Sequence, residues 1–279
     1  MSPPTLSVVL LNYNHGKFLR QCLAGLLSQT YADFEIVLVD DGSTDNSREI
    51  IHEHMAADSR IKLTAFPVNR GIKAGLREGL SHATGRYFYS AAADDFVVNK
   101  EFFHRAVRVL AEDPRPAGYY GVAGIYVAET EKLAGAMGTA ETEGYNTPLQ
   151  CCVGLLKYRS IVTGPSCIVR RDLFMQWGGN EIEVLMDQLG PQMDYFLNHS
   201  LAWRYGMYFE KQPFACQRIF QARTNYSANL DIFAYAARLA EMEKRLRTID
   251  ITYPDIEKDW MRWRALNLLD AIKKSGVRL

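Results

Sequence analysis

The sequence predicts an α/β fold with a mostly parallel central sheet flanked by helices, and three observations support this. Short runs of apolar and β-branched residues alternate with longer segments of helical period, which is typical of strands buried on both faces. Polar and turn-forming residues follow the apolar runs. The chain has 279 residues, enough for one large domain. The expected strands are Leu6 to Leu11, Phe34 to Val39, Ile61 to Phe66 and Tyr87 to Ala91.

Helices are expected between and after these strands. Apolar residues recur at helical spacing from Leu19 to Leu27, which predicts a helix that packs one face on the sheet. The next helix is expected to begin near Ser43 or Thr44, because a hydroxyl can cap the free amides of a helix start. A helix that contains Phe102 to Leu110 should end before Pro114, since proline stops helices.

The second half of the chain has a less regular pattern. Glu129 to Pro148 shows no period and predicts a mobile loop, and Asn180 to Gln192 is also expected to be irregular. The other expected elements are strands at Tyr119 to Val127 and Ser166 to Val169, helices at Leu173 to Trp177 and Met193 to Tyr205, and two C-terminal helices separated near Pro254. We therefore expect one domain over residues 1–225, with halves 1–100 and 101–225, and a C-terminal helical extension over 226–279.

Charge and cysteine content exclude several classes of protein. The chain has 32 basic and 32 acidic residues, so no net field gathers nucleic acid or holds the chain on an anionic membrane. Its five cysteines include no C-x-x-C pair, which indicates reduced thiols. No apolar run reaches the roughly 18 residues of a spanning helix. No signal-type N-terminus is present either, so a cytoplasmic location is expected.

Polar residues cluster where the expected strands end. In an open α/β sheet, ligands bind beyond the carboxyl ends of the strands. Two acidic pairs at one sheet edge are costly unless a ligand offsets their charge. The sequence therefore predicts a ligand site at this edge. The stretches that follow the four strands are Asn12-Tyr13-Asn14-His15, Asp40-Asp41-Gly42-Ser43, Asn69-Arg70-Gly71 and Asp94-Asp95.

These stretches resemble the family 2 glycosyltransferases, which have the GT-A fold. The similar segments, in order along the first hundred residues, are SVVLLNYNHGKFLRQCLAGLLSQTYADFEIVLVDDGSTDNS, NRGIKAGLREGLSHATGRYF and AAADD. Gly178-Gly179 and the stretch MDYFLNHSLAWRYG, which ends at Gly206, are similar to the family's acceptor-side region. The resemblance implies a nucleotide-sugar donor, uridine-linked or similar, and transfer to an acceptor hydroxyl with inversion. It also implies a role in the biosynthesis of a cell-surface polysaccharide.

The resemblance gives donor-binding roles to several residues. Asp41 matches an aspartate that commonly meets the nucleobase, and Tyr13 would line the same pocket. A uracil ring suits both, because it offers an N–H to a carboxylate and a flat face to an aromatic ring. A plain strand-to-helix turn for Asp41 and simple packing for Tyr13 are the alternatives. Further candidate donor contacts are Asn69 and, as cations for the diphosphate or as solvated charges, Arg70, Lys73 and Arg77.

The family's metal motif is Asp-x-Asp, and this chain departs from it. Alignment on Gly85 and Tyr87 places Ala92 at the first aspartate and Asp94 at the second. Mg²⁺ or Mn²⁺ needs few protein ligands when diphosphate oxygens and water complete its shell, so Asp94 with help from Asp95 would suffice. The metal would offset charge on the departing nucleotide diphosphate. Alternatively, the acidic pair only ends a strand and caps the next helix.

A hydroxyl acceptor also needs a general base, and Asp194 is the candidate. The position resembles the family's Glu-Asp pair, although Met193 replaces the glutamate. An acidic residue is also a common structural feature at a helix start. Asp187, Glu181 and Glu183 in the adjoining segment are rival candidates.

Two other classes of function stay open. One is a nucleotide-sugar-binding protein that has lost catalysis, with Ala92 as the lesion. The other is a nucleotidyltransferase, whose usual glycine-rich and basic loop after the first strand is absent here. The acceptor is expected to be a saccharide or a lipid-linked molecule.

The last expected helix has an apolar stripe with basic residues at its borders. This stripe could lie on a membrane surface that holds a lipid-linked acceptor. Alternatively, it packs on its own domain or on a second subunit in a homodimer. The stripe consists of Trp260, Trp263, Leu266, Leu269 and Ile272.

Overall fold

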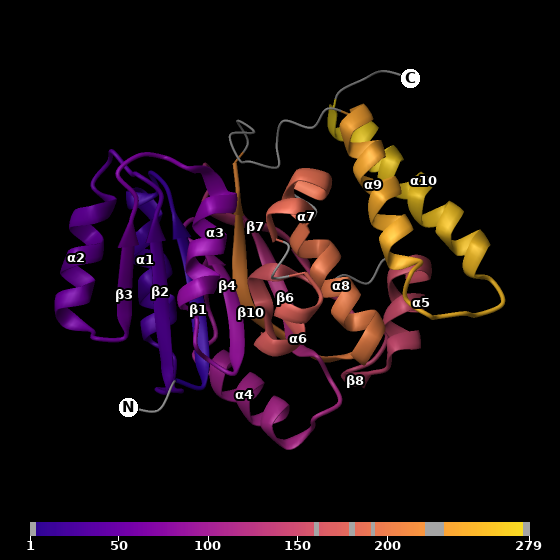
Figure 1. The fold of residues 1–279 in the computed structure, drawn as a ribbon, viewed down its shortest axis with the longest axis horizontal. Helices are drawn as coiled ribbons and strands as arrows, with labels where there is room; N and C mark the ends of the chain where they lie inside the picture. Colours follow the sequence, from indigo (N-terminus) through magenta and orange to yellow (C-terminus); the bar gives the residue numbers. More distant parts are fainter. Residues whose placement is uncertain (1–3, 159–161, 179–181, 191–192, 221–231, 276–279) are drawn as a thin grey trace.

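The computed structural model describes residues 4–158, 162–178, 182–190, 193–220 and 232–275, which form one sheet of ten strands with helices on both faces (Figure 1). The predicted α/β fold class is confirmed. The strand order is β3 (Ile61–Ala65), β2 (Phe34–Asp40), β1 (Leu6–Asn12), β4 (Tyr87–Ala92), β9 (Cys167–Arg170), β6 (Gly118–Val127), β10 (Met207–Ile219) and β5 (Phe96–Val97). Two further strands, β7 (Lys132–Met137) and β8 (Gly144–Asn146), pair with β6 and β10.

Strand direction brings several strand ends to one edge of the sheet. β1 pairs in parallel with β2 and β4, so Leu6 lies opposite both Phe34 and Tyr87. β9 is antiparallel to both β4 and β6, and β10 is parallel to β6. The strands β1, β2, β4, β6 and β10 therefore end at the same edge, which we call the carboxyl edge. The segment that precedes β9 lies at this edge as well.

Two layers of helices cover the sheet because its central strands are apolar on both faces. Every residue of β2 is buried, and in β1 Val8 and Leu10 face one helical layer while Val9 faces the other. The first layer consists of α1 (Gly16–Leu27), α2 (Ser47–Ala57) and α4 (Phe102–Glu112). The second layer includes α3 (Gly71–His82), α5 (Pro148–Tyr158), α6 (Arg171–Gln176), α7 (Ile182–Leu189) and α8 (Met193–Tyr205).

The C-terminal helices α9 (Ile232–Leu246) and α10 (Ile256–Ser275) extend the second layer. They pack on α5, α7 and α8 at the end of the molecule away from β3 (Figure 1). Trp260 and Trp263 are buried in a row of aromatic contacts with Trp203 of α8. These tryptophans of the apolar stripe thus pack on their own domain. No described helix is both long enough and apolar enough to cross a membrane.

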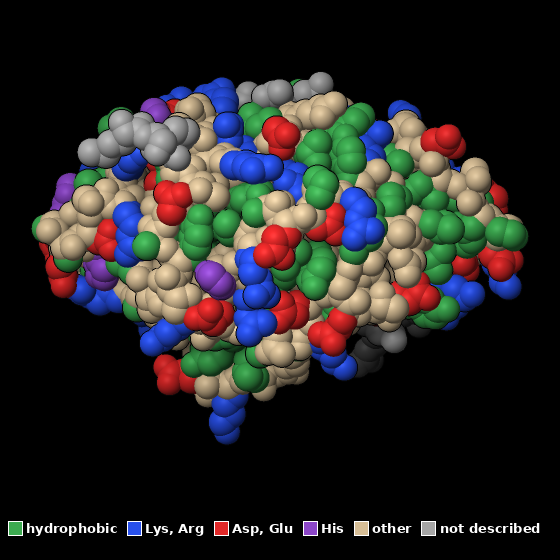
Figure 2. Space-filling model, turned by 90° about the horizontal axis from the view of Figure 1, so that it is seen from below, with side chains coloured by type: hydrophobic (Ala, Val, Ile, Leu, Met, Phe, Trp, Pro, Cys, Tyr) green, Lys and Arg blue, Asp and Glu red, His purple; other side chains and the backbone are tan. Residues whose placement is uncertain are grey.

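The surface at the opposite edge, where β1 begins, is mixed in charge. Figure 2 shows acidic and basic side chains interspersed over this face, so no single sign dominates it. Hydrophobic side chains gather at its right-hand end, where α9 and α10 lie in Figure 1. Within α10, Met261 and Leu269 are exposed hydrophobic residues.

Three expectations about local structure are wrong. The predicted loop from Glu129 to Pro148 contains β7 and β8, which are held by pairing with longer strands although β7 is almost fully exposed. Within the segment predicted to be irregular, α7 forms because Leu185 and Leu189, one helical turn apart, are buried. Helix α2 begins at Ser47, later than expected, because the Ser43 hydroxyl bonds Asp40 instead.

Candidate active site

The carboxyl edge brings together the polar residues that follow β1, β2 and β4. Asn12 lies opposite Asp40 in the sheet, and Leu11 lies opposite Ala92. The residues that come next along each strand therefore stand side by side at this edge.

Asp40 is part of the scaffold of this edge. It is fully buried, and its carboxylate accepts hydrogen bonds from the Asn12 amide at 2.8 Å, the Ser43 hydroxyl at 2.5 Å and Arg48 Nε at 2.9 Å. A carboxylate with this many protein donors has little capacity for a ligand. Asp40 therefore fixes the loop shape and leaves ligand contact to its neighbours.

Asp41 connects the end of β2 to the start of α3. Its carboxylate oxygens accept the backbone N–H groups of Arg70 at 2.6 Å and Gly71 at 2.9 Å, and the residue is only 7% exposed. The approach of the two segments is close, since a Cβ on Gly42 would lie 2.3 Å from the backbone carbon of Val68. Asp41 thus has a structural role in the turn that follows β2 and at the start of α3, and its contact with the base stays a prediction.

Tyr13 and the loop around it are held by reciprocal caps. Asn14, which has a positive φ of 53°, accepts the backbone N–H of Thr44 at 2.8 Å through its side chain. Asp45 in turn accepts the N–H of Gly16, at the start of α1, at 2.9 Å. Between these fixed points Tyr13 is 43% exposed. It is therefore available to a ligand at the carboxyl edge.

The two adjacent carboxylates after β4 have different surroundings. The Asp95 N–H donates to the carbonyl of Ala92 at 3.0 Å, which closes a tight turn. Asp95 Oδ1 accepts the backbone N–H of Arg218 at 2.7 Å, whereas the Asp94 carboxylate has no hydrogen-bond or ion-pair partner in the described part of the chain. Burial, and then the nearby charge of Asp94, raise the pKa of Asp95 well above its usual value.

Sequence reasoning missed Arg218, which lies near the end of β10. Its guanidinium donates to the carbonyl of Asp94 and, at 2.5 Å, to the side-chain oxygen of Gln21. It also lies 4.3 Å from the ring centre of Phe18. No local motif marks this arginine, because its partners are far away along the chain. No element is expected from the sequence at residues 207–219, because Pro213 interrupts the strand pattern there, and in the structure the register of β10 shifts on both sides of it.

Asp194 lies at the same edge, on the first turn of α8. Ile168 of β9 is opposite Tyr89, so the short 3-10 helix Gly164–Ser166 before β9 lies beside the end of β4. A Cβ on Gly164 would be 3.1 Å from Asp194 Oδ2, which places this carboxylate against that helix. Desolvation by surrounding atoms raises the pKa of Asp194, although the residue keeps an exposed surface.

The rival base Asp187 contacts one of the proposed diphosphate cations between α3 and α7. Lys73 of α3 forms an ion pair with Asp187 of α7, and both side chains are partly exposed. Arg77 lies one turn further along α3 and is exposed. Glu181 and the side chain of Glu183 lie outside the described residues. Asn69 precedes this helix, where its side-chain oxygen accepts the N–H of Gly71.

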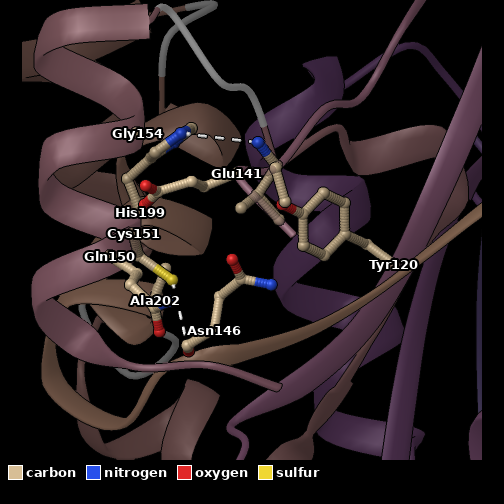
Figure 3. Close-up of a pocket in the computed structure, with 10 residues that line it drawn as sticks. Tyr120, Glu141, Asn146, Gln150, Cys151, Gly154, His199 and Ala202 are labelled. Atoms are coloured by element: carbon tan, nitrogen blue, oxygen red, sulfur yellow. Dashed lines mark hydrogen bonds between the residues drawn. The ribbon is translucent and has the colours of Figure 1, made fainter. Parts of the chain in front are cut away.

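A separate cavity lies between α5, α8 and β6, and Figure 3 shows the residues that line it. Its volume is about 10 Å³, room for one water molecule at most. His199 on its wall is held by the Tyr195 carbonyl at 2.7 Å and the Val162 N–H at 3.4 Å. This cavity is too small for a nucleotide sugar, and its histidine is already bonded.

The chemistry of the carboxyl edge fits a weakly held divalent ion. No group of three or more His, Cys, Asp or Glu side chains that could hold a metal occurs among the described residues. Asp94 nevertheless offers a carboxylate that has no partner among the described residues, and Asp95 uses only Oδ1 in its bond with the Arg218 N–H. Hard oxygen ligands of this kind suit Mg²⁺ or Mn²⁺ when most of the shell comes from a diphosphate and water.

The open sheet and its polar carboxyl edge define a protein of the GT-A class, and solved structures agree. TarS of S. aureus, residues 1–349 in complex with UDP-GlcNAc, matches 96% of this chain and 73% of its own with a TM-score of 0.70 at 16% identity. The mannosyltransferase PcManGT from Pyrobaculum calidifontis, in complex with GDP-Man and Mn²⁺, matches 100% and 77% with a TM-score of 0.58 at 20% identity. At these identities the likeness shows the fold.

Residues 7–176 match glycosyl transferase family 2, and the chain belongs to this family. The glycosyltransferase GlyG of Streptococcus pneumoniae is 42% identical over 117 residues, which are 41% of this chain and 39% of that protein. An uncharacterized glycosyltransferase of Haemophilus influenzae is 39% identical over 99 residues, which are 36% of this chain and 40% of that protein. The chain thus spans about two fifths of the length of these curated relatives.

Proposed function

We propose that this protein is a glycosyltransferase that moves a sugar from a nucleotide-sugar donor, uridine-linked, to an acceptor hydroxyl with inversion at the anomeric carbon. The observation that supports this most directly is a pair of carboxyl groups around the end of β4. Asp94 has no partner in the described part of the chain, and Asp194 has a raised pKa. Asp94 suits the binding of a divalent ion that contacts the diphosphate, and Asp194 suits the acceptance of a proton from the acceptor hydroxyl.

In the proposed reaction, Asp194 accepts the proton of the acceptor hydroxyl while the hydroxyl oxygen attacks the anomeric carbon. The bond from that carbon to the diphosphate oxygen breaks, and its electron pair leaves with the nucleoside diphosphate. Attack on the face opposite the leaving group inverts the anomeric centre. A base with a raised pKa is better matched to this task than an ordinary carboxylate, because it holds the proton more strongly.

Donor binding is assigned to the residues of the first sheet half. Tyr13 and Asp41 would contact the base, with Asn69 beside them. Lys73 and Arg77 would face the diphosphate from α3. Asp94, assisted by Asp95, would hold a divalent ion that supplies positive charge to the departing diphosphate.

The acceptor side is proposed in coarser terms. A saccharide or a lipid-linked molecule in a cell-surface polysaccharide pathway is the expected acceptor, and the cytoplasm, at or near the inner membrane face, is the expected location. The exposed Met261 and Leu269 of α10 are the residues through which a homodimer or a peripheral membrane contact would form.

Ala92 favours a second candidate, a nucleotide-sugar-binding protein that has lost catalysis. The test is incubation with a panel of nucleotide sugars and Mn²⁺, together with calorimetry of nucleotide binding. Release of a nucleoside diphosphate with transfer or hydrolysis of the sugar supports the enzyme. Tight donor binding without turnover supports the binding protein. In a parallel reaction with a nucleoside triphosphate and a sugar 1-phosphate, release of pyrophosphate with formation of a nucleotide sugar would identify a nucleotidyltransferase and overturn the proposal.

A further inference from the structure

Arg218 connects the end of β10 to the acidic turn after β4. We propose that Arg218 is a positioning residue, which fixes this turn so that the Asp94 carboxylate is presented to the metal and diphosphate of the donor. The inference rests on the proposed function and assigns a role at the same site to a residue that the resemblance does not include.

The contacts of Arg218 hold the turn at two points. Its guanidinium donates to the backbone carbonyl of Asp94, and its own backbone N–H donates to Asp95 Oδ1 at 2.7 Å. The Asp94 backbone is therefore fixed while its carboxylate stays without a partner in the described structure. In Asp95, by contrast, the carboxylate itself is held, because its Oδ1 accepts the Arg218 N–H.

The surroundings of Arg218 suit a positioning role and exclude direct contact with the donor. Arg218 is only 4% exposed, and its guanidinium carbon lies 4.3, 5.1 and 5.5 Å from the ring centres of Phe18, Phe96 and Tyr126. The planar guanidinium can stack on rings while it donates both to Asp94 and to Gln21 at 2.5 Å. A lysine ammonium is not planar and cannot donate to two separate acceptors in this geometry while it stacks on a ring.

The departure at Ala92 makes this positioning more important. Where two aspartates share a metal, an error in the place of one is partly corrected by the other. Here Ala92 supplies no carboxylate and one oxygen of Asp95 is engaged by the Arg218 N–H, so the geometry of the metal depends mainly on Asp94. A metal ligand that is held by an outer partner typically loses about 10–100-fold in metal affinity when that partner is removed.

The experiment compares Arg218→Lys with the matched control Arg170→Lys. Arg170 is also buried, and it donates to the backbone carbonyls of Leu110, Asp113 and Pro116 at the other edge of the sheet. Calorimetry measures Mn²⁺ binding to the UDP-saturated protein, and melting curves measure stability. We expect both variants to melt earlier, and only Arg218→Lys to bind Mn²⁺ about tenfold or more weakly. Equal Mn²⁺ affinity in the two variants would overturn the inference.

A second variant applies if Arg218→Lys does not fold. Gln21→Leu removes the acceptor of the second guanidinium bond of Arg218 and alters no proposed metal ligand. A positioning role predicts weaker Mn²⁺ binding to the UDP-saturated variant than to wild type, and wild-type affinity would contradict it. Failure of the proposed function has a different signature, because wild-type protein would then bind neither UDP alone nor UDP with Mn²⁺.

Discussion

Asp94 and Asp95 are adjacent in sequence but differ in what surrounds them. Since the Asp94 carboxylate has no hydrogen-bond or ion-pair partner in the described part of the chain and its charge repels the adjacent Asp95, Asp94→Asn should not lower the free energy of unfolding. The same change should abolish sugar transfer, because the amide is a poor ligand for a divalent ion. Transfer assays at saturating Mn²⁺ with parallel melting curves test this. Full activity at high metal would remove Asp94 from the site.

Replacement of Asp194 by asparagine should change stability and activity in opposite directions. The pKa of Asp194 is raised in the folded protein by desolvation, so the fold favours its protonated form. The stability it contributes is complete below the usual pKa of an aspartate and is lost as the pH rises through the raised pKa. At pH 7 the charged, desolvated carboxylate lowers the stability of the fold, and Asp194→Asn removes that charge. The variant should therefore melt at a higher temperature while its turnover falls by about a hundredfold or more.

The measurement for Asp194 is a series of melting curves and single-turnover rates between pH 4 and 8. Wild-type turnover should increase with pH as the carboxylate loses its proton, and the stabilising effect of Asp194→Asn should vanish at the acid end. Normal turnover in Asp194→Asn would transfer the role of base to Asp187, Glu181 or Glu183.

Residue roles differ in how far the sequence could predict them. Asp41 and Asp94 lie one and two residues after the ends of β2 and β4, so the rule that ligands bind beyond strand ends predicts their place at the carboxyl edge. Asp194 required a resemblance, since nothing local distinguishes it from a helix-start carboxylate. Arg218 could not be found, because its role depends on Gln21 and the Asp94 turn, which are more than a hundred residues away in the chain.

At the scale of elements, the contact between α3 and α7 joins a proposed donor cation to a rival base. Lys73 and Asp187 are both partly exposed, so their ion pair contributes at most about 1 kcal/mol to stability. Asp187 also competes with a diphosphate for Lys73. We expect Lys73→Met to weaken donor binding and Asp187→Asn to strengthen it slightly, by about twofold.

The control for this pair is Glu78→Gln, which removes a carboxylate paired with His82 on the same helix. Calorimetry with a nucleoside diphosphate should give the wild-type affinity for this variant. If Asp187→Asn and Lys73→Met weaken diphosphate binding to the same extent, the ion pair itself orders the site. The hypothesis that Asp187 competes with the diphosphate for Lys73 would then be wrong.

Elements were predictable where their own residues determine them. β1, β2, β3 and β4 are apolar runs with turn residues at their ends, and each was predicted within one residue at either end. β7 is held by its neighbour rather than by an apolar pattern, so its residues gave no signal. In β10 the polar residues around Pro213 conceal a strand at the centre of the second sheet half.

At the scale of the molecule, the sheet separates two apolar cores. One lies between the sheet and α1, α2 and α4, and the other extends from Val9 and Val37 through α8 to Trp260 and Trp263. The C-terminal helices therefore share a core with strands of the first hundred residues. The boundary expected near residue 226 therefore does not coincide with a boundary between two cores. The shared core favours one unfolding transition for the domain and the C-terminal helices.

Two neighbouring residues of α10 test whether the C-terminal helices are integral to the domain. Trp260 is fully buried against Trp203 and Trp263, whereas Met261 is 64% exposed. Trp260→Ala should lower the free energy of unfolding by about 3–5 kcal/mol, because it leaves a large cavity in the shared core. The control Met261→Ala should change it by less than about 0.5 kcal/mol.

Urea unfolding followed by both far-UV circular dichroism and tryptophan fluorescence measures these values. A shared core predicts coincident transitions for both probes in wild type and a single earlier transition in Trp260→Ala. Two separate transitions, with only the minor one displaced by Trp260→Ala, would instead show that residues 226–279 unfold as an independent extension.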